Sequence, residues 1–131
     1  MSGEPIRWIY PIVGGAIAEG VTIALTALVV VLSGHGAMGG DPVAQRIGAV
    51  MEASVGSLAC YVMGWWAARR AGARFQAHGG LVGTMAAVLT ALGAIYGPLG
   101  ESAYYVVAVL MKILAGSAGG RMAERMAARD R

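Results

Sequence analysis

Residues 8–33 read WIYPIVGGAIAEGVTIALTALVVVLS, an apolar stretch in which Glu19 is the single charged residue. A helix of about 20 apolar residues is long enough to cross the hydrocarbon core of a bilayer. The stretch is too long for the apolar core of a signal peptide, and Glu19 interrupts it, so we interpret it as a retained membrane helix. Pro11 lies in its first turn, where the amides have no helical partners, and therefore costs little.

Three further stretches resemble this one in length and composition. The four stretches cover about 8–32, 46–68, 77–97 and 103–122, and short turn-like segments separate them. Together they use most of the chain and leave no room for a soluble domain. We therefore predict an all-α fold, a polytopic membrane protein with a single domain over 1–131 whose four transmembrane helices form an up-down bundle.

The composition excludes several other classes of protein. Hydrophobic residues make up 57% of the chain and charged residues 13%, whereas soluble domains carry about 25% charged residues. The mean hydropathy is +0.64. Cys60 is the single cysteine, which excludes a disulfide scaffold. The excess of basic over acidic residues, ten against seven, does not indicate a nucleic-acid partner, because most of the basic residues flank apolar stretches. The expected partner is the lipid bilayer.

The arginines predict the orientation of the helices. Eight bases lie on one side of the predicted membrane, and only Arg46 lies on the other. Cytoplasmic segments collect Lys and Arg, so we expect both termini in the cytoplasm. The eight bases are Arg7, Arg69, Arg70, Arg74, Arg121, Arg125, Arg129 and Arg131.

Three ionisable residues, Glu19, Glu52 and Lys112, fall well inside the predicted spans. A charge at the bilayer centre costs about 2.5–3.5 kcal/mol on insertion scales and usually faces the protein interior. A helix rises about 1.5 Å per residue, which places Glu19 and Lys112 both about 15 Å deep and Glu52 about 9 Å from the outer surface. A Glu19–Lys112 pair is therefore geometrically feasible, with Glu52 as a surplus acid nearby.

Two functions are compatible with such an intramembrane charge network. An ion pair between helices would act as a clasp that fixes which helices pack together. It would suit a non-catalytic helix-bundle scaffold or accessory subunit. Alternatively, the carboxylates would relay protons or cations in a small coupled transporter or channel. The opposite signs of Glu19 and Lys112 favour the clasp.

Glycines recur at helical spacing on several of the predicted spans. Small residues let helix backbones approach closely, and inside lipid this contact drives association. The glycines could serve packing within one bundle, or a homo-oligomer or larger membrane complex. The candidate packing residues are Gly15, Gly48, Gly56, Gly79, Gly83 and Gly116.

The two halves of the chain share a pattern. Residues 15–28 align with 79–92 at an offset of 64, and residues 64–71 align with 120–127 at an offset of 56. Two repeated helical hairpins in the same orientation would explain this pattern. Chance matching of Ala, Gly and Leu would explain it equally well.

Catalytic and metal-binding motifs are missing from the sequence. It has no phosphate-binding glycine loop, no HExxH motif and no CxxC motif. His35 and Met38 could offer soft metal ligands, but two such residues in a glycine-rich segment are typical of a plain loop. We expect no enzyme activity, no cofactor and no metal.

Residues 64–83 read GWWAARRAGARFQAHGGLVG: a helix end, an arginine-rich turn and the glycine-rich start of the next span. This stretch resembles small uncharacterised four-helix bacterial membrane proteins. The resemblance covers about 20 residues and implies a four-span protein of the bacterial inner membrane. It implies no activity.

Overall fold

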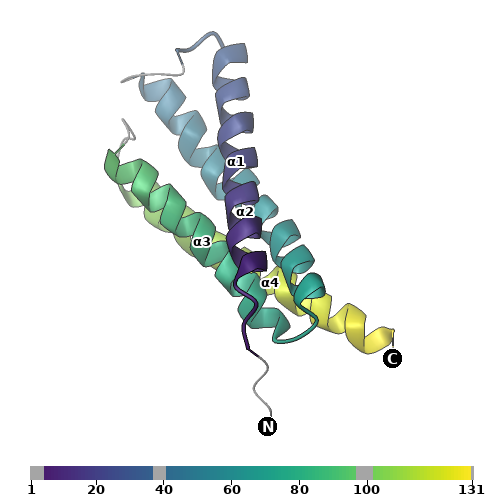
Figure 1. The fold of residues 1–131 in the computed structure, drawn as a ribbon. Coiled ribbons are helices and arrows are strands. Elements are labelled where there is room, and N and C mark those ends of the chain that lie inside the picture. Colours follow the sequence, from purple (N-terminus) through teal and green to yellow (C-terminus); the bar gives the residue numbers. More distant parts are fainter. Residues whose placement is uncertain (1–4, 37–40, 97–101, 131) are drawn as a thin grey trace.

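The computed structural model describes residues 5–36, 41–96 and 102–130, and the regular secondary structure of these ranges is all α-helix (Figure 1). This confirms the predicted all-α fold with four helices. By length and composition, each of the four could cross a membrane. They are α1 (Ile9–Leu32), α2 (Pro42–Ala71), α3 (Phe75–Tyr96) and α4 (Ser102–Arg129).

Helix α2 extends beyond the predicted stretch of 46–68 at both ends. At its start, the Asp41 side chain accepts a hydrogen bond of 2.8 Å from the Val43 N–H, and Pro42 occupies the first turn. At its end, Gly72 adopts φ 72° in the left-handed region, which glycine tolerates. The capping residues lie outside the apolar stretch, so hydropathy alone underestimates the helix.

Helix α4 also exceeds its predicted end at residue 122 and continues to Arg129. Its last turns hold alanine, methionine and arginine, which favour helix although they are less apolar. Helices α1 and α3 begin and end within two residues of the predicted bounds, and residue 97 lies outside the described ranges.

Helices α2 and α3 each pack against all three other helices, whereas α1 and α4 make no backbone contact within the described ranges. If a symmetry axis related the α1–α2 hairpin to the α3–α4 hairpin, α1 would correspond to α3 and α2 to α4. The α2–α3 contact would then require an equivalent contact between α1 and α4. The two hairpins are therefore not packed equivalently, although their sequences share a pattern.

Glycines set the short distances between the helices. A Cβ on Gly64 of α2 would lie 2.6 Å from the Gly116 carbonyl oxygen of α4, and a Cβ on Gly15 of α1 would lie 2.6 Å from Met85 Cβ of α3. No larger residue fits either position without moving a helix. Large apolar side chains instead cover the outside of the bundle, with Leu114 69% exposed.

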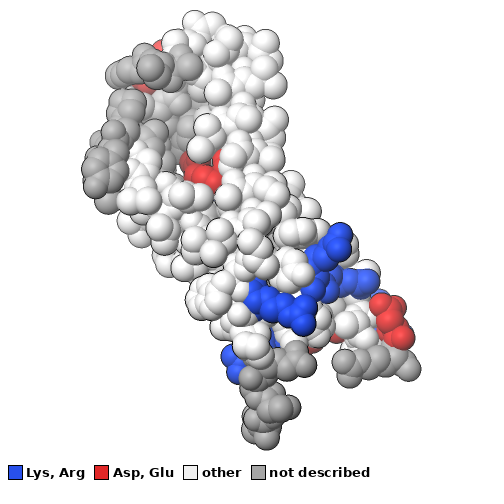
Figure 2. Space-filling model, in the orientation of Figure 1, with Lys and Arg blue, Asp and Glu red and all other residues white. Residues whose placement is uncertain are grey.

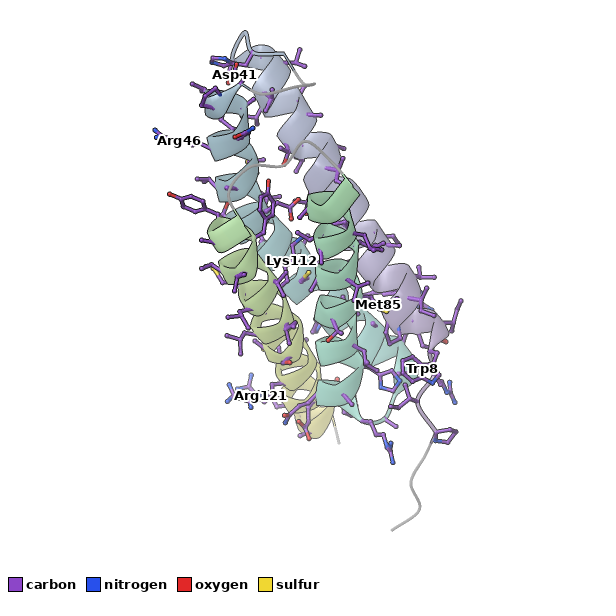
Figure 3. All side chains as sticks on the ribbon, turned by 90° about the vertical axis from the view of Figure 1, so that its left-hand side faces the viewer. Trp8, Asp41, Arg46, Met85, Lys112 and Arg121 are labelled. Carbon is purple, nitrogen blue, oxygen red and sulfur yellow. The ribbon has the colours of Figure 1, made fainter. Side chains whose placement is uncertain are left out.

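The start of α1, the α2–α3 connection and the end of α4 lie at the same end of the bundle (Figure 1). There His78, which is 1% exposed, accepts a hydrogen bond of 3.1 Å from the Arg7 N–H, and Arg69 pairs with Asp130 at 3.7 Å. Figure 2 shows the basic side chains of the visible face gathered at this end, and Figure 3 labels Arg46 near the other end.

Candidate functional site

Lys112 of α4 lies in the middle of the bundle, and its side chain is fully buried (Figure 3). Its ammonium group donates to Glu19 Oε2 of α1 at 2.6 Å, to Thr90 Oγ1 of α3 at 2.6 Å, and to Glu52 Oε2 of α2. An ammonium has three N–H donors, so this set uses all of them. The site therefore takes one residue from each of the four helices and links α1 to α4, whose backbones do not touch.

Two glycines leave room for the Lys112 residue. A Cβ on Gly56 of α2 would lie 2.6 Å from Lys112 Cε. A Cβ on Gly83 of α3 would collide with the Lys112 carbonyl group and would lie 2.7 Å from Ile113 Cα. Because neither neighbouring helix places a side chain here, the long lysine side chain can reach the carboxylate of α1.

Thr90 mediates between the charged groups. Its hydroxyl accepts from Lys112 and has acceptors at Glu19 Oε1 (3.0 Å), the Ala86 carbonyl (3.1 Å) and Glu52 Oε2 (3.4 Å). A hydroxyl has one hydrogen to donate. The three acceptors therefore compete for this hydrogen. Rotation about the C–O bond would redirect the Thr90 hydroxyl from one acceptor to another.

The sequence analysis overlooked Thr90, although a signal was present. Thr90 continues a row of small residues on α3 through Ala86 and Gly79, and the row holds buried positions throughout. By contrast, Thr84 is exposed and bonds the Gly80 carbonyl of its own helix at 3.0 Å.

The charges of the site do not balance. With all three groups ionised, Glu19, Glu52 and Lys112 sum to a net charge of −1. Glu52, predicted as a surplus acid near the pair, contacts the lysine directly and shares it with Glu19. No described residue donates to Glu52 Oε1, and the Glu52 side chain is 12% exposed. Glu52 Oε1 can therefore accept a further hydrogen bond, and one proton or monovalent cation would neutralise the net charge of the site.

A cavity of about 280 Å³ reaches this carboxylate pair. Figure 2 shows acidic atoms at the floor of a hollow in an uncharged surface, and among the described acidic residues only Glu19 and Glu52 line this cavity. Its walls are mostly apolar. They include Ile23, Ala27 and Val30 of α1, Gly48 of α2, Leu89 of α3 and Tyr105 of α4.

The structure places the six predicted packing glycines in two kinds of environment. Gly15, Gly56, Gly79, Gly83 and Gly116 each lie against another helix, where a Cβ would come within 2.6 Å or less of a neighbouring atom. Gly48 differs, because a Cβ there would meet only Tyr105 Oη, at 4.0 Å. Gly48 borders the cavity rather than a helix contact, because the helices diverge at its level.

Other candidate residues have structural partners or lie outside the site. Cys60 is buried in an apolar cluster with Ala18 and Ala86, which explains it as a packing residue. His35 Nδ1 contacts Asp41 Oδ2 at 2.6 Å, whereas Met38 and Glu101 lie outside the described residues. Within the described ranges, no three His, Cys, Asp or Glu residues gather as metal ligands would.

Comparisons of the chain with known protein families, with curated proteins and with solved structures found no match in any of the three. The resemblance noted for residues 64–83 therefore stays a prediction.

Proposed function

We propose that this protein is a small proton- or cation-coupled transporter of the bacterial inner membrane. In this proposal its helices cross the membrane four times in up-down order, with both termini in the cytoplasm. The four apolar helices support membrane insertion. The concentration of arginines at the end that holds the start of α1 and the end of α4 supports the orientation.

The observation that carries the proposal is the open cavity beside an unbalanced buried charge. Ionisable residues inside a membrane are costly, and they commonly mark ion pathways. Glu52 belongs to a site that carries one extra negative charge when its three groups are ionised, and it borders the cavity. A proton or monovalent cation that enters the cavity would neutralise this site.

The same geometry provides a way to couple ion binding to helix movement. A proton on Glu52 would weaken the hydrogen bond between Glu52 and Lys112. Lys112 would then be held by its hydrogen bonds to Glu19 and Thr90. The partner of the lysine would thereby shift from α2 toward α1 and α3. Transport further requires a path to the arginine-rich end, where glycine contacts such as Gly64–Gly116 hold the helices together.

A second candidate function is the non-catalytic scaffold or accessory subunit. One specific observation favours it: the three hydrogens of Lys112 are all bonded, and they join all four helices. Such a clasp would stabilise one arrangement of the helices. In that case the chain would purify in mild detergent with a second copy of itself or within a larger membrane complex, and no ion flux would be needed.

Flux measurements separate the two functions. The full chain would be reconstituted into liposomes that contain a pH-sensitive dye, and proton uptake would be followed under an imposed membrane potential. The transporter proposal expects uptake above that of empty liposomes and its loss in Glu52→Gln. Glu124→Gln makes the same chemical change at an exposed residue near the end of α4 and should leave uptake unchanged. Uptake no faster than in empty liposomes would leave the scaffold as the function.

A further inference from the structure

The cavity is larger than a proton or a bare metal ion needs. Its volume of about 280 Å³ lies just below the range of about 300–1,000 Å³ typical of sites for drug-sized ligands. It extends from the carboxylates along α1 through Ile23, Ala27 and Val30. A ligand that filled it would have one end at Glu52 and a body several atoms long between apolar side chains.

Two oxygens among the residues that line the cavity lack hydrogen-bond partners in the described part of the chain. Glu52 Oε1 takes no hydrogen bond from the described residues. Thr26 also lines the cavity, and its fully buried Oγ1 has no partner among the described residues. Buried polar atoms normally have partners, and each exception calls for an explanation. A donor group on a ligand would satisfy the Glu52 oxygen.

The remaining lining excludes several classes of ligand. An anion would meet the net negative charge of Glu19, Glu52 and Lys112. A divalent metal ion would reverse the net charge of the ionised site from −1 to +1 instead of neutralising it. A neutral apolar molecule would leave the extra charge and the Glu52 oxygen unsatisfied.

We propose that this cavity binds a small organic monocation, a protonated primary amine with a short hydrocarbon chain. The ammonium group would bond Glu52 Oε1, and the hydrocarbon chain would lie against Ile23, Val30 and Leu89. The inference rests on the proposed function in one respect: the amine would be the cargo that shares the carboxylates with a proton. Binding itself requires no transport and can be measured separately.

The experiment uses the full chain in a non-ionic detergent and titration calorimetry with n-butylammonium, with n-butanol as the neutral probe of similar size. Butylammonium should bind and butanol should not. Affinity should fall as the pH is lowered, because protons compete for the carboxylates. Equal binding of both probes would overturn the proposal, as would stronger binding of sodium or potassium ions than of butylammonium.

Variants locate the site within the molecule. Glu52→Gln should weaken butylammonium binding at least about tenfold, which corresponds to the loss of a charged hydrogen bond. Gly48 lines the cavity and tolerates a Cβ, whose nearest neighbouring atom would be 4.0 Å away, so the side chain of Gly48→Leu would occupy cavity space. It should abolish binding. Gly20→Leu is the matched control, because a Cβ there meets nothing within 4 Å and the residue is exposed.

Proton uptake by Gly48→Leu distinguishes this inference from the proposed function. Gly48 borders the space for the hydrocarbon chain, and the variant leaves Glu52 in place, so it should lose butylammonium binding and keep the proton uptake of the unmodified chain. Butylammonium binding without any proton uptake would refute the coupling and keep the site. Proton uptake without butylammonium binding, or binding that survives in Gly48→Leu, would refute the amine site alone.

Discussion

Gly56 of α2 lies directly against the side chain of Lys112 of α4, so close that a Cβ on Gly56 would be 2.6 Å from Lys112 Cε. The charge network therefore depends on an uncharged residue that makes none of its hydrogen bonds. The lysine passes α2 where that helix has no side chain, and it donates to carboxylates on both sides.

This contact predicts that Gly56→Ala destabilises the bundle. The added methyl group would displace the lysine side chain from its acceptors, and overpacking of this kind costs typically about 1–3 kcal/mol. Gly56→Leu should be worse. Thermal unfolding in detergent would measure the loss, with Gly20→Ala as the matched control at an open position. Val55 is half-buried and would serve less well as the control position. Equal melting temperatures for Gly56→Ala and Gly20→Ala would contradict the contact.

Lys112→Met should sharply reduce the yield of folded protein, because it leaves two carboxylates buried without a cation. Removal of one partner from a buried pair costs about 3–5 kcal/mol in soluble proteins. The double variant with Glu19→Gln should recover only part of the loss, since Glu52 keeps its charge. The triple variant that adds Glu52→Gln should recover most of it. Size-exclusion profiles would report folded protein, and equal losses in the single and triple variants would rule out direct pairing.

Thr90→Val keeps the shape of the side chain but removes the hydroxyl between the charged groups. Lys112 then loses one acceptor and Glu19 loses one donor. An unsatisfied buried group costs about 1–3 kcal/mol, so thermal stability should fall, and Thr90→Ser should restore it. Thr84→Val is the control, because Thr84 is exposed and bonds only its own helix. A similar effect in both valine variants would show that Thr90 acts through helix propensity instead.

The proposed orientation predicts the accessibility of two single cysteines in a Cys60→Ala background. Ser33→Cys, beside the α1–α2 connection, should react with a membrane-impermeant thiol reagent from outside intact cells. Ala128→Cys, near the end of α4, should react only after the membrane is opened. Both residues are exposed in the bundle, so differences in reactivity report sidedness. The reverse pattern would invert the orientation.

We expect the Asp41 carboxylate, at the start of α2, to make a pH-dependent contribution to the stability of the fold. The Val43 N–H, and then the His35 ring, lower the pKa of the Asp41 carboxyl below its ordinary value. The carboxylate therefore stabilises the fold above the unfolded-state pKa of about 3.9, and this contribution is lost as the pH falls through the lower folded-state value. Asp41→Asn keeps a capping side chain without the charge. Its melting temperature should lie below that of the unmodified chain at neutral pH and converge with it in acid; a constant difference would refute the electrostatic contribution.

The fold and part of the site could be predicted because both follow from one-dimensional rules. Apolar length gave four helices, and the rise per residue placed Glu19 and Lys112 at the same depth. The shared role of Glu52 could not be read from depth alone. A lysine side chain is long and has three donors, so it joins carboxylates at different levels when a residue such as Gly56 leaves the path open.

Thr90 and the cavity required the tertiary structure. A hydroxyl inside a helix can bond the carbonyl four residues earlier, as Thr90 also does with Ala86, so its type does not reveal a role between helices. The cavity depends on how far the helices diverge. Gly48 lies at helical spacing like the packing glycines, yet it borders open space because no helix approaches it there.

The buried cation of the site lies on α4, whereas both of its acids lie on earlier helices, with consequences for how the proposed membrane protein would be made. Ribosomes deliver α1, α2 and α3 before α4, so in the proposed topology Glu19 and Glu52 would enter the bilayer before Lys112 can reach them. Until α4 arrives, the three-helix intermediate would hold two acids in lipid without this counter-ion, a state that favours protonation of the carboxylates or delayed release from the insertion machinery. Insertion of α4 would then complete the charge network and join all four helices in one step.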